Sequence, residues 1–360
     1  MLLPDARQRL AVSQGMGGIH QFTHVVSPAN PACVEDIGGK HAWLGLTRPY
    51  DRTRQFCAMS KGASLSHGPS GSGGYVTRPT VGTSARPDLP LAVVVGAGGM
   101  GAAIARRLGA RNRLIVADRD RASLDRLVAA LCAEGHDARG VVCDVTDRAA
   151  VEEFAEVVAK AGPLAALAHV VGLSPSMGDF RTIMAVNLIG ARLIHDAMLP
   201  LATGGTAAIF IASLAAHAAP IDPSLHAILD DPLAPVFLDR IETAPDEPAT
   251  PTLAYRLSKS ALIRLCQREA RAWGAQGARI LSLSPGLIAT PMGALEFEKQ
   301  PMKYDLLAAT PLAREGTMLE IAATVDFLIS RDASFISGID ILVDGGLLAA
   351  MRHPASGEPT

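Results

Sequence analysis

The chain has 360 residues, and its hydrophobic content of 49% is ample for a buried core in one large domain or two modest ones. Its formal net charge of −2 offers no basic field for nucleic acid. Asp, Arg or Pro interrupts each apolar run before it reaches the length of a membrane span. We therefore expect neither nucleic acid nor a membrane among the partners of the protein.

The five cysteines are scattered and include no C-x-x-C pair. This usage argues for a reducing compartment and against a zinc site or a disulfide framework. The first residues are not followed by the apolar segment of a secretory signal. We therefore predict a cytoplasmic protein with no metal site.

Residues 1–88 show no sustained period of a helix or a strand, and Ser66–Gly74 is of low complexity. Such a segment cannot bury enough apolar area to offset the entropy lost on ordering it. We predict a largely disordered or loosely attached extension, whose histidines and cysteines are incidental. A further hypothesis is that translation starts at an internal methionine such as Met59, so that the mature protein lacks this segment.

The stretch Leu91–Ile104 passes from a run of apolar, β-branched residues into glycines and then into an alanine-rich helix. Gly96, Gly98 and Gly101 form the pattern G-x-G-x-x-G. The first permits a tight turn, the second lets a pyrophosphate approach the backbone, and the third lets the helix lie close to the sheet. The helix then directs its free N–H groups at the phosphates, so we also place Met100 at the cofactor. Glycine-rich turns of this kind also occur without a ligand.

A second predicted strand, Leu114–Ala117, ends in Asp118, twenty positions beyond Gly98. An acidic residue at this place accepts hydrogen bonds from the adenosine ribose, although an aspartate after a strand is otherwise a turn or a helix cap. With the glycines it favours dinucleotide binding. Asp118 would repel a 2′-phosphate, so NAD is the expected cofactor. Arg119 could pair with such a phosphate, which leaves NADP as the alternative.

From residue 89 to 352 apolar strands alternate with amphipathic helices. The predicted strands are Leu91–Val95, Leu114–Ala117, Gly140–Cys143, Leu164–Val171, Ala207–Ala212, Arg279–Ser284 and Ile339–Val343. This alternation predicts an α/β fold, a doubly wound parallel sheet of about seven strands (a Rossmann domain) with its ligands at the carboxyl edge. Residues 353–360 would form a tail.

Tyr255 and Lys259 lie one turn apart on a helix that we expect to run from Tyr255 to about Trp273, so their side chains share a face. A nearby ammonium would lower the pKa of the phenol from its usual value near ~10 and make it a usable acid or base. The same pair is also common on helix surfaces. Ser213 follows a strand, where it would hold a carbonyl oxygen or cap a helix. Asn187 would be a functional amide or a satisfied core amide.

Together these motifs resemble the short-chain dehydrogenase/reductase family over roughly Leu89 to Met351. The resemblance implies hydride transfer between the nicotinamide of a bound dinucleotide and a carbinol or carbonyl carbon. Tyr255 would move the proton of the oxygen, Ser213 would position that oxygen, and Asn187 would support a water relay.

The resemblance also implies cofactor contacts along the carboxyl edge of the sheet. These are Asp144 and Val145 at the adenine, Gly172 after the fourth strand, Lys259 at the nicotinamide ribose with Tyr255 also at the cofactor, and Pro285, Gly286, Ile288 and Thr290 at the carboxamide. Two departures stand out. The turn from Gly96 to Gly101 is one residue shorter than is usual in the family. The Asn-Asn-Ala-Gly segment expected after the fourth strand is His-Val-Val-Gly here, and we expect His169 to be a hydrogen-bonded substitute at the end of the strand.

A long insertion separates Ser213 from Tyr255, which lie forty-two positions apart. It occupies about residues 217–251, where seven prolines divide apolar positions typical of one or two short amphipathic helices. Beside the predicted tyrosine it is a candidate substrate lid, and a subunit contact is the alternative. Its length and placement resemble the bacterial 3α-hydroxysteroid dehydrogenase/carbonyl reductase branch of the family.

A second segment, Met292–Thr310, carries apolar side chains that would complete an apolar chamber with few inward charges. Such a chamber suits a bulky neutral alcohol or ketone, such as a steroid, a terpenoid or another alicyclic molecule. The alternatives are dihydrodiol dehydrogenation, a biosynthetic ketoreduction, or a non-catalytic dinucleotide-binding scaffold. The family resemblance also implies a homodimer or homotetramer. Because the insertion could cover the usual helical interface, we expect contacts through the last strand and Ala322–Ser330.

Overall fold

The computed structural model describes residues 88–300 and 302–353. The predicted extension up to residue 87, Met59 within it, and the tail beyond residue 353 lie outside the described residues. Within them, seven parallel strands form one sheet in the order β3-β2-β1-β4-β5-β6-β9. The strands are β1 (Leu91–Val95), β2 (Arg113–Asp118), β3 (Ala138–Val142), β4 (Leu164–His169), β5 (Ala202–Ile211), β6 (Arg279–Pro285) and β9 (Asp340–Val343).

All seven predicted strands are present, and the predicted doubly wound fold is confirmed. The largest difference is in β5, which begins at Ala202 rather than at Ala207. Because β1 pairs with both β2 and β4, the strand order reverses at β1. In open sheets of this kind the crevice beyond the carboxyl ends of the strands at the reversal is where ligands bind.

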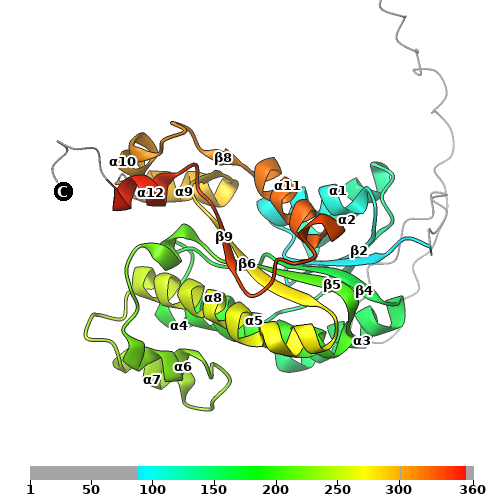
Figure 1. Ribbon diagram of the computed structural model, residues 1–360, viewed down its shortest axis with the longest axis horizontal. Helices are drawn as coiled ribbons and strands as arrows, with labels where there is room; N and C mark the ends of the chain where they lie inside the picture. The colour runs from blue at the N-terminus through cyan, green and yellow to red at the C-terminus, as the bar shows by residue number, and fades with distance from the viewer. Residues whose placement is uncertain (1–87, 301, 354–360) are drawn as a thin grey trace, which may run out of the picture. The chain divides into compact units, whose positions relative to one another are not determined.

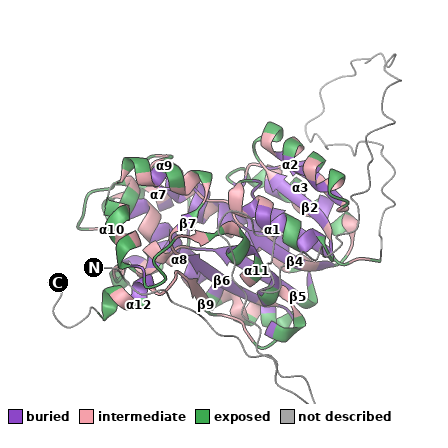
Figure 2. Ribbon diagram, turned by 90° about the horizontal axis from the view of Figure 1, so that it is seen from above, coloured by how far each residue is buried: buried purple, intermediate pink, exposed green. Residues whose placement is uncertain are grey.

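Helices cover both faces of the sheet (Figure 1). On one face lie α1 (Gly99–Gly109), α2 (Arg121–Ala133) and α11 (Met318–Ile329), and on the other lie α3 (Arg148–Ala161), α5 (Gly190–Met198) and α8 (Pro251–Ala275). Each face forms its own apolar cluster, and Figure 2 shows that most of each sheet strand is buried. Burial on both faces explains why the strands are almost uninterrupted apolar runs.

The helix that carries Tyr255 begins four residues earlier than predicted, at Pro251. Thr250 caps it, since the Thr250 side chain accepts a hydrogen bond from the Leu253 N–H at 3.2 Å. A proline at the first helical position is favoured because its missing N–H would have no partner there. The prolines that mark the insertion in the sequence therefore include the start signal of this helix.

The insertion is folded onto the helical layer beneath the sheet. It contains η4 (Pro223–Leu225), α6 (His226–Leu229) and α7 (Phe237–Thr243), which pack with α4 (Phe180–Met184), the π-helical turn η1 (Ala185–Ile189) and α8 in a third apolar cluster. Ion pairs fasten it: Asp230 pairs with Arg264 at 2.7 Å and Arg268 at 2.9 Å, and Arg181 pairs with Asp239 at 2.8 Å. The predicted short amphipathic helices are thus present, and they cover α4 and part of α8.

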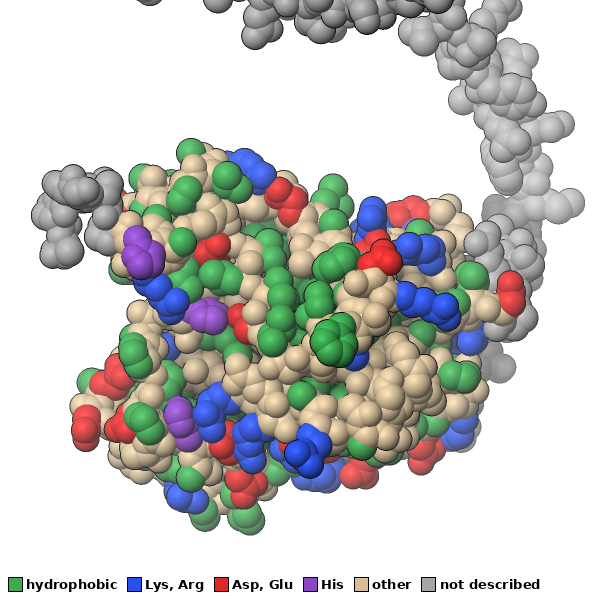
Figure 3. All heavy atoms as spheres, in the orientation of Figure 1, with side chains coloured by type: hydrophobic (Ala, Val, Ile, Leu, Met, Phe, Trp, Pro, Cys, Tyr) green, Lys and Arg blue, Asp and Glu red, His purple; other side chains and the backbone are tan. Residues whose placement is uncertain are grey.

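The remaining elements lie mostly beyond the carboxyl edge. They are η2 (Leu199–Leu201), η3 (Leu214–His217), β7 (Ile288–Ala289), α9 (Pro291–Lys299), α10 (Met302–Ala309), β8 (Gly316–Thr317), η5 (Arg331–Ala333) and α12 (Leu347–Arg352). In Figure 1, α9, α10 and α12 group together at one end of the sheet. On the face drawn in Figure 3, lysine and arginine side chains lie among aspartate and glutamate side chains, with no broad area of one charge.

One continuous helical run, Phe180–Leu201, is long and apolar enough to cross a membrane by length and composition. This run was not predicted from the sequence, because a charged residue or a proline was taken to end each apolar segment. Of its most apolar window, 61% is buried inside the fold, which is also the behaviour of a core helix.

Candidate functional site

The glycine turn between β1 and α1 has the geometry of a phosphate cradle. Gly96 has φ +113°, a value that L side chains rarely adopt, and its N–H donates to the Ala117 carbonyl at 2.7 Å. A Cβ on Gly101 would overlap the carbonyl oxygen of Gly96, so only glycine lets the helix lie this close to the turn. A Cβ on Gly98 would meet nothing within 4 Å. Open space therefore faces Gly98, the residue before the first turn of α1, which carries Met100; this is the position that we predict for the pyrophosphate.

Asp118 is fixed beside this turn at the end of β2. Its carboxylate accepts hydrogen bonds from the Ala97 N–H at 2.7 Å and from the Asp120 N–H at 2.9 Å, one on each oxygen. Each carboxylate oxygen can accept a further hydrogen bond, so the group is placed to receive ribose hydroxyls next to the phosphate position. The neighbouring Arg119 is exposed.

The next strand brings Asp144 and Val145 to the same edge. Asp144 accepts hydrogen bonds from the N–H and the hydroxyl of Thr146 at 2.9 and 2.7 Å, which fixes the loop after β3. Val145 is buried against Gly190, where a Cβ would come within 2.6 Å of Val145 Cγ2. Gly190 thus permits α5 to pack directly against the loop that we predict at the adenine.

The four predicted catalytic residues lie together at the carboxyl ends of β4 and β5. Lys259 is 4% exposed; its Nζ donates to the Ile211 carbonyl at 2.8 Å and lies 5.9 Å from the centre of the Tyr255 ring. Tyr255 shares a side-chain hydrogen bond with Ser213. Ser213 also caps η3 by accepting from the Ala215 N–H at 3.2 Å, so the capping interpretation of this serine holds as well.

Asn187 occupies the π-helical turn and is fully buried. Its side chain accepts from the Leu173 N–H at 2.7 Å and donates to the Leu173 carbonyl at 3.0 Å, so the interpretation as a satisfied core amide is correct in this structure. The same contact pins the chain next to Gly172, where a Cβ would lie 3.0 Å from Lys259 Nζ. Asn187 thereby fixes the conformation of the loop that contacts the Lys259 ammonium.

The pKa shifts of Tyr255 and Lys259 differ from the prediction. Burial raises the pKa of the Tyr255 phenol, the hydrogen bond with Ser213 opposes this rise, and the charge of Glu296 adds to it. Lys259 does not offset this rise of the tyrosine pKa, because its ammonium faces the ring of Tyr255 and donates to the Ile211 carbonyl. Burial in turn lowers the pKa of Lys259 from 10.5 to about 8. The expected lowering of the tyrosine pKa is therefore wrong for this structure.

The residues predicted at the carboxamide follow β6. A Cβ on Gly286 would lie 2.7 Å from the Asp344 Cα, so the backbone of this loop passes directly against the loop after β9. Pro285 ends β6, and Ile288 is buried in β7. Thr290 caps α9 by accepting from the Gly293 N–H at 2.8 Å. These residues form one short path that leads from the sheet edge to α9.

His169 behaves differently from the prediction. The ring is fully buried at the end of β4, 5.2 Å from the ring of Phe210, and neither ring nitrogen has a hydrogen-bond partner among the described residues. The expectation of a hydrogen-bonded substitute is therefore wrong. Burial, with the charge of Lys259 added, lowers the pKa of His169 to about 3, so the imidazole is neutral and acts as a packed ring.

A carboxylate that the sequence did not indicate also acts on Tyr255. Glu296 on α9 is only 3% exposed. It belongs to the segment Met292–Thr310, which was expected to line the site with apolar side chains and few inward charges. The signal available in the sequence was a single acidic residue between Leu295 and Phe297, which is also the pattern of an exposed helical position.

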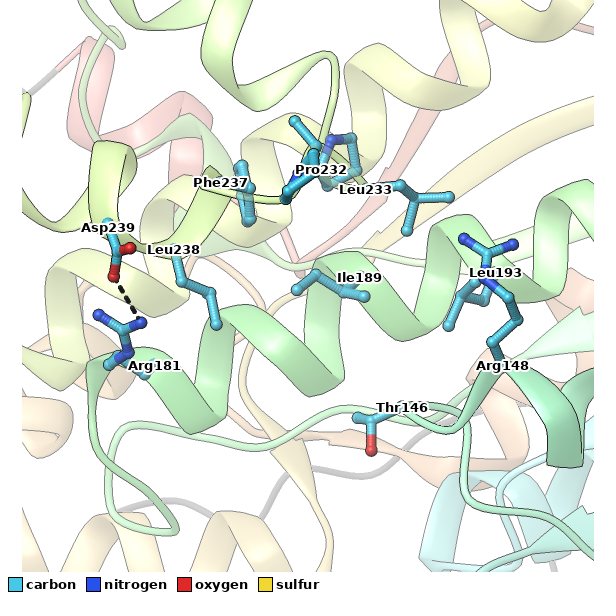
Figure 4. Close-up of a pocket in the computed structure, with 12 residues that line it drawn as sticks. Thr146, Arg148, Arg181, Ile189, Leu193, Pro232, Leu233, Phe237, Leu238 and Asp239 are labelled. Atoms are coloured by element: carbon cyan, nitrogen blue, oxygen red, sulfur yellow. Dashed lines mark hydrogen bonds and ion pairs between the residues drawn. The ribbon is translucent and has the colours of Figure 1, made fainter.

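A cavity of about 300 Å³ lies away from these residues, between the N-terminus of α3, α5 and the insertion (Figure 4). Ile189 and Leu193 form one wall, and Leu238 of α7 faces them. None of the predicted site residues lines it. The cavity is the space that remains between the insertion and α5.

Comparison with known proteins agrees with this geometry. The family model described as "short chain dehydrogenase" matches residues 90–224, and the one described as "Enoyl-(Acyl carrier protein) reductase" matches residues 246–348. A protein named short-chain dehydrogenase/reductase bsc3, from Alternaria brassicicola, is 34% identical over 274 residues, covering 73% of this chain and 97% of the relative. The 3-alpha-hydroxysteroid dehydrogenase/carbonyl reductase of Comamonas testosteroni is 32% identical, over 56% of this chain and 79% of the relative.

Among solved structures, a blue fluorescent protein from a metagenomic library, in complex with NADPH, matches with a TM-score of 0.57 and 26% identity. The match covers 72% of this chain and 97% of that protein. The sheet, the sequence relatives and the family models thus agree over the same residues. The chain belongs to the short-chain dehydrogenase/reductase family, whose members are alcohol or carbonyl oxidoreductases that use a nicotinamide dinucleotide.

Proposed function

We propose that the protein transfers a hydride between NAD(H) and the carbinol or carbonyl carbon of a bulky, neutral, apolar substrate. The observation that carries this proposal is the convergence of Tyr255, Ser213, Lys259 and Asn187 at the carboxyl ends of β4 and β5. A scaffold that only bound a dinucleotide would not need a proton-transfer set beside the crevice. When bound, the nicotinamide supplies the hydride chemistry.

In the direction of ketone reduction, Tyr255 acts as the acid. Burial raises the pKa of its phenol, so the proton is present at neutral pH and can be donated to the substrate oxygen. Ser213, which shares a hydrogen bond with Tyr255, can donate to the same oxygen and hold it in place. In the direction of alcohol oxidation the phenol must first lose its proton, which the positive charge of Lys259 would favour once the ammonium swings from Ile211 toward the hydroxyl.

Lys259 and Asn187 support this exchange. With its pKa lowered to about 8, Lys259 can both carry and release a proton near neutral pH. Asn187 holds the Leu173 backbone by two hydrogen bonds and so fixes the loop at Gly172 that contacts the ammonium. A water at this loop would complete the route by which the proton leaves the site.

We propose NAD rather than NADP because the Asp118 carboxylate lies beside the glycine turn, where one of its oxygens accepts from the Ala97 N–H. A 2′-phosphate on the adenosine ribose would meet this carboxylate and be repelled. One solved relative is a complex with NADPH, so the ratio of kcat/KM for NAD over NADP is the direct test. A clear preference for NADP would overturn this part of the proposal.

The substrate class rests on the apolar residues of α9 and α10. Leu295, Met302 and Tyr304 are exposed, and Phe297 stacks edge-on with Tyr304 at 5.1 Å. A relative in Comamonas testosteroni carries the name of a steroid dehydrogenase and carbonyl reductase. The test is a screen of secondary alcohols and ketones, steroids included, that follows the absorbance of reduced nicotinamide. Turnover only of small polar alcohols would contradict the substrate class while leaving the reaction intact.

We also propose that the protein forms a homodimer through β9 and α11. The insertion already covers α4, so this helical face is occupied within the subunit. At the β9 edge of the sheet, the side chains of Phe327, Phe335 and Ile339 are exposed. Light scattering with Phe327→Asp tests this: the wild-type protein should have twice the mass of the variant.

A further inference from the structure

Glu296 is a buried carboxylate that joins two segments far apart in the sequence. One carboxylate oxygen accepts hydrogen bonds from the Ser174 hydroxyl at 2.7 Å, from the Ser176 N–H at 3.3 Å and from the Ser176 hydroxyl. The other accepts from the Gln300 side chain at 2.8 Å and pairs with Lys303 at 3.3 Å. We call this set of contacts the Glu296 clamp. It ties α9 and α10 to the loop that follows β4.

The clamp ends on the backbone that carries the proposed catalytic residues. Gly172, two positions before Ser174, lies against Lys259 Nζ, and Asn187 holds both backbone groups of Leu173. The Glu296 clamp and the Asn187 contact therefore act on adjacent residues of one loop. A movement of α9 would therefore move this loop. A movement of the loop would change the backbone that surrounds the Lys259 ammonium.

A packing role alone does not explain this residue. A buried carboxylate is costly unless hydrogen bonds and a counter-charge compensate it, and an apolar side chain would pack α9 against the loop without that cost. The structure compensates the charge with two hydroxyls, one N–H, one amide and one ammonium. What a carboxylate adds over an apolar side chain is a directional contact and a negative charge near Tyr255.

We propose that Glu296 is a positioning residue of the active site, which ties α9 and α10 to the loop after β4 and thereby fixes the backbone against which the Lys259 ammonium lies. This inference rests on the proposed function only in that it places this loop in the active site. In support, the charge of Glu296 contributes to the raised pKa of Tyr255. Burial pushes the pKa of Glu296 itself upward, but the hydroxyls of Ser176 and Ser174 and the Lys303 ammonium outweigh it, so this pKa lies below its usual value.

The charged and titratable groups around Glu296 come from three elements. Lys303 belongs to α10, Tyr255 to α8, and Lys299 on α9 itself donates to the Ser176 carbonyl at 3.4 Å. Because the carboxylate keeps its charge at neutral pH, the clamp is constant over the working range. The pH-dependent group that it influences is the tyrosine.

The test compares Glu296→Gln with Glu298→Gln, which removes the same charge from an exposed position on the same helix. Amide hydrogen exchange is measured first, on the full chain and without substrate. Glu296→Gln should speed exchange in α9 and in residues 172–178, and Glu298→Gln should not. Ser174→Ala should reproduce the exchange effect of Glu296→Gln. Exchange that is the same in both glutamine variants would overturn the clamp, whatever the enzyme acts on.

The second measurement is the pH profile of kcat/KM for alcohol oxidation with NAD. Without the nearby negative charge the phenol ionises more readily, so the rising limb should shift to lower pH in Glu296→Gln only. The substrate KM should rise more than kcat falls. A raised KM with an unmoved limb would reduce Glu296 to a structural residue and contradict the proposal. An absence of turnover in the wild-type enzyme would count against the proposed function and leave the exchange result standing.

Discussion

The two halves of the sheet hold their functional residues by different means. In the half that contains β1 to β4, backbone groups hold the functional residues. Gly96 turns the chain, and the Asp118 carboxylate accepts hydrogen bonds from the N–H groups of Ala97 and Asp120. In the half after β4, side chains distant in sequence meet. Asn187 contacts Ser258 across 71 positions, and Glu296 contacts Ser174 across 122. The cofactor half is thus built locally and the substrate half by tertiary contacts.

The first way to separate the halves is Tyr255→Phe. The variant loses the proton donor and at most one hydrogen bond to the nicotinamide ribose, so kcat should fall by about 10²–10⁴-fold while NAD affinity is largely retained. Turnover and NAD binding are measured on the same preparation. A Tyr255→Phe variant that turns over normally would refute the proposed acid.

Asp118→Ser perturbs the cofactor half alone. Removing the carboxylate removes both the acceptor for a ribose hydroxyl and the repulsion of a 2′-phosphate. The ratio of kcat/KM for NAD over NADP should fall by about 10- to 100-fold, the equivalent of about 1.5–3 kcal/mol for a hydrogen bond to a charged group. An unchanged ratio would mean that Asp118 does not contact the ribose.

The glycine turn can be divided into a packing position and a ligand position. In Gly101→Ala the new Cβ overlaps the Gly96 carbonyl, so the free energy of unfolding should fall by about 1–3 kcal/mol. In Gly98→Ala the Cβ meets no protein atom within 4 Å, so stability should hold and only NAD affinity should fall. Denaturant titration and NAD titration are the two measurements. Equal loss of stability in both variants would contradict the cradle geometry.

The smallest expected effect is a pH dependence of stability in the substrate half. Lys259 has its pKa lowered from 10.5 to about 8, so above pH 8 the unfolded chain binds a proton that the folded chain does not. The contribution of Lys259 to the free energy of unfolding should therefore rise from pH 8 to about 10, by about 1–2 kcal/mol. The raised pKa values of the Cys143 and Cys266 thiols and of the Tyr255 phenol act in the opposite sense, so this contribution is measured as the difference between the wild-type protein and Lys259→Met.

Lys259→Met should abolish this rise, and Lys160→Met, at a side chain 71% exposed, should leave it in place. Chemical denaturation at several pH values compares the three proteins. A rise that persists in Lys259→Met would mean that another group causes it.

The same contrast explains how far the sequence could be interpreted. Strands buried on both faces are apolar runs, and a glycine turn must carry glycines, so the fold and the residues around Asp118 could be predicted from local pattern. The start of α8 was misplaced because Pro251 was counted with the prolines of the insertion, although with Thr250 it forms the start signal of the helix.

Contacts between distant side chains leave no such pattern. Nothing in the neighbourhood of Glu296 names Ser174 as its partner, and nothing next to Tyr255 shows that burial would outweigh Lys259. His169 was expected to find a hydrogen bond because most buried polar groups do, yet its ring packs on Phe210 instead. These features depend on the tertiary fold and became visible only with it.

The most direct test of the central claim is a crystal structure of the protein with NAD. The account predicts the pyrophosphate at Gly98, the adenosine ribose on Asp118, and the nicotinamide ribose within hydrogen-bond distance of Tyr255 and Lys259. A dinucleotide bound elsewhere, or one whose nicotinamide lies beyond the reach of the Tyr255 hydroxyl, would contradict it.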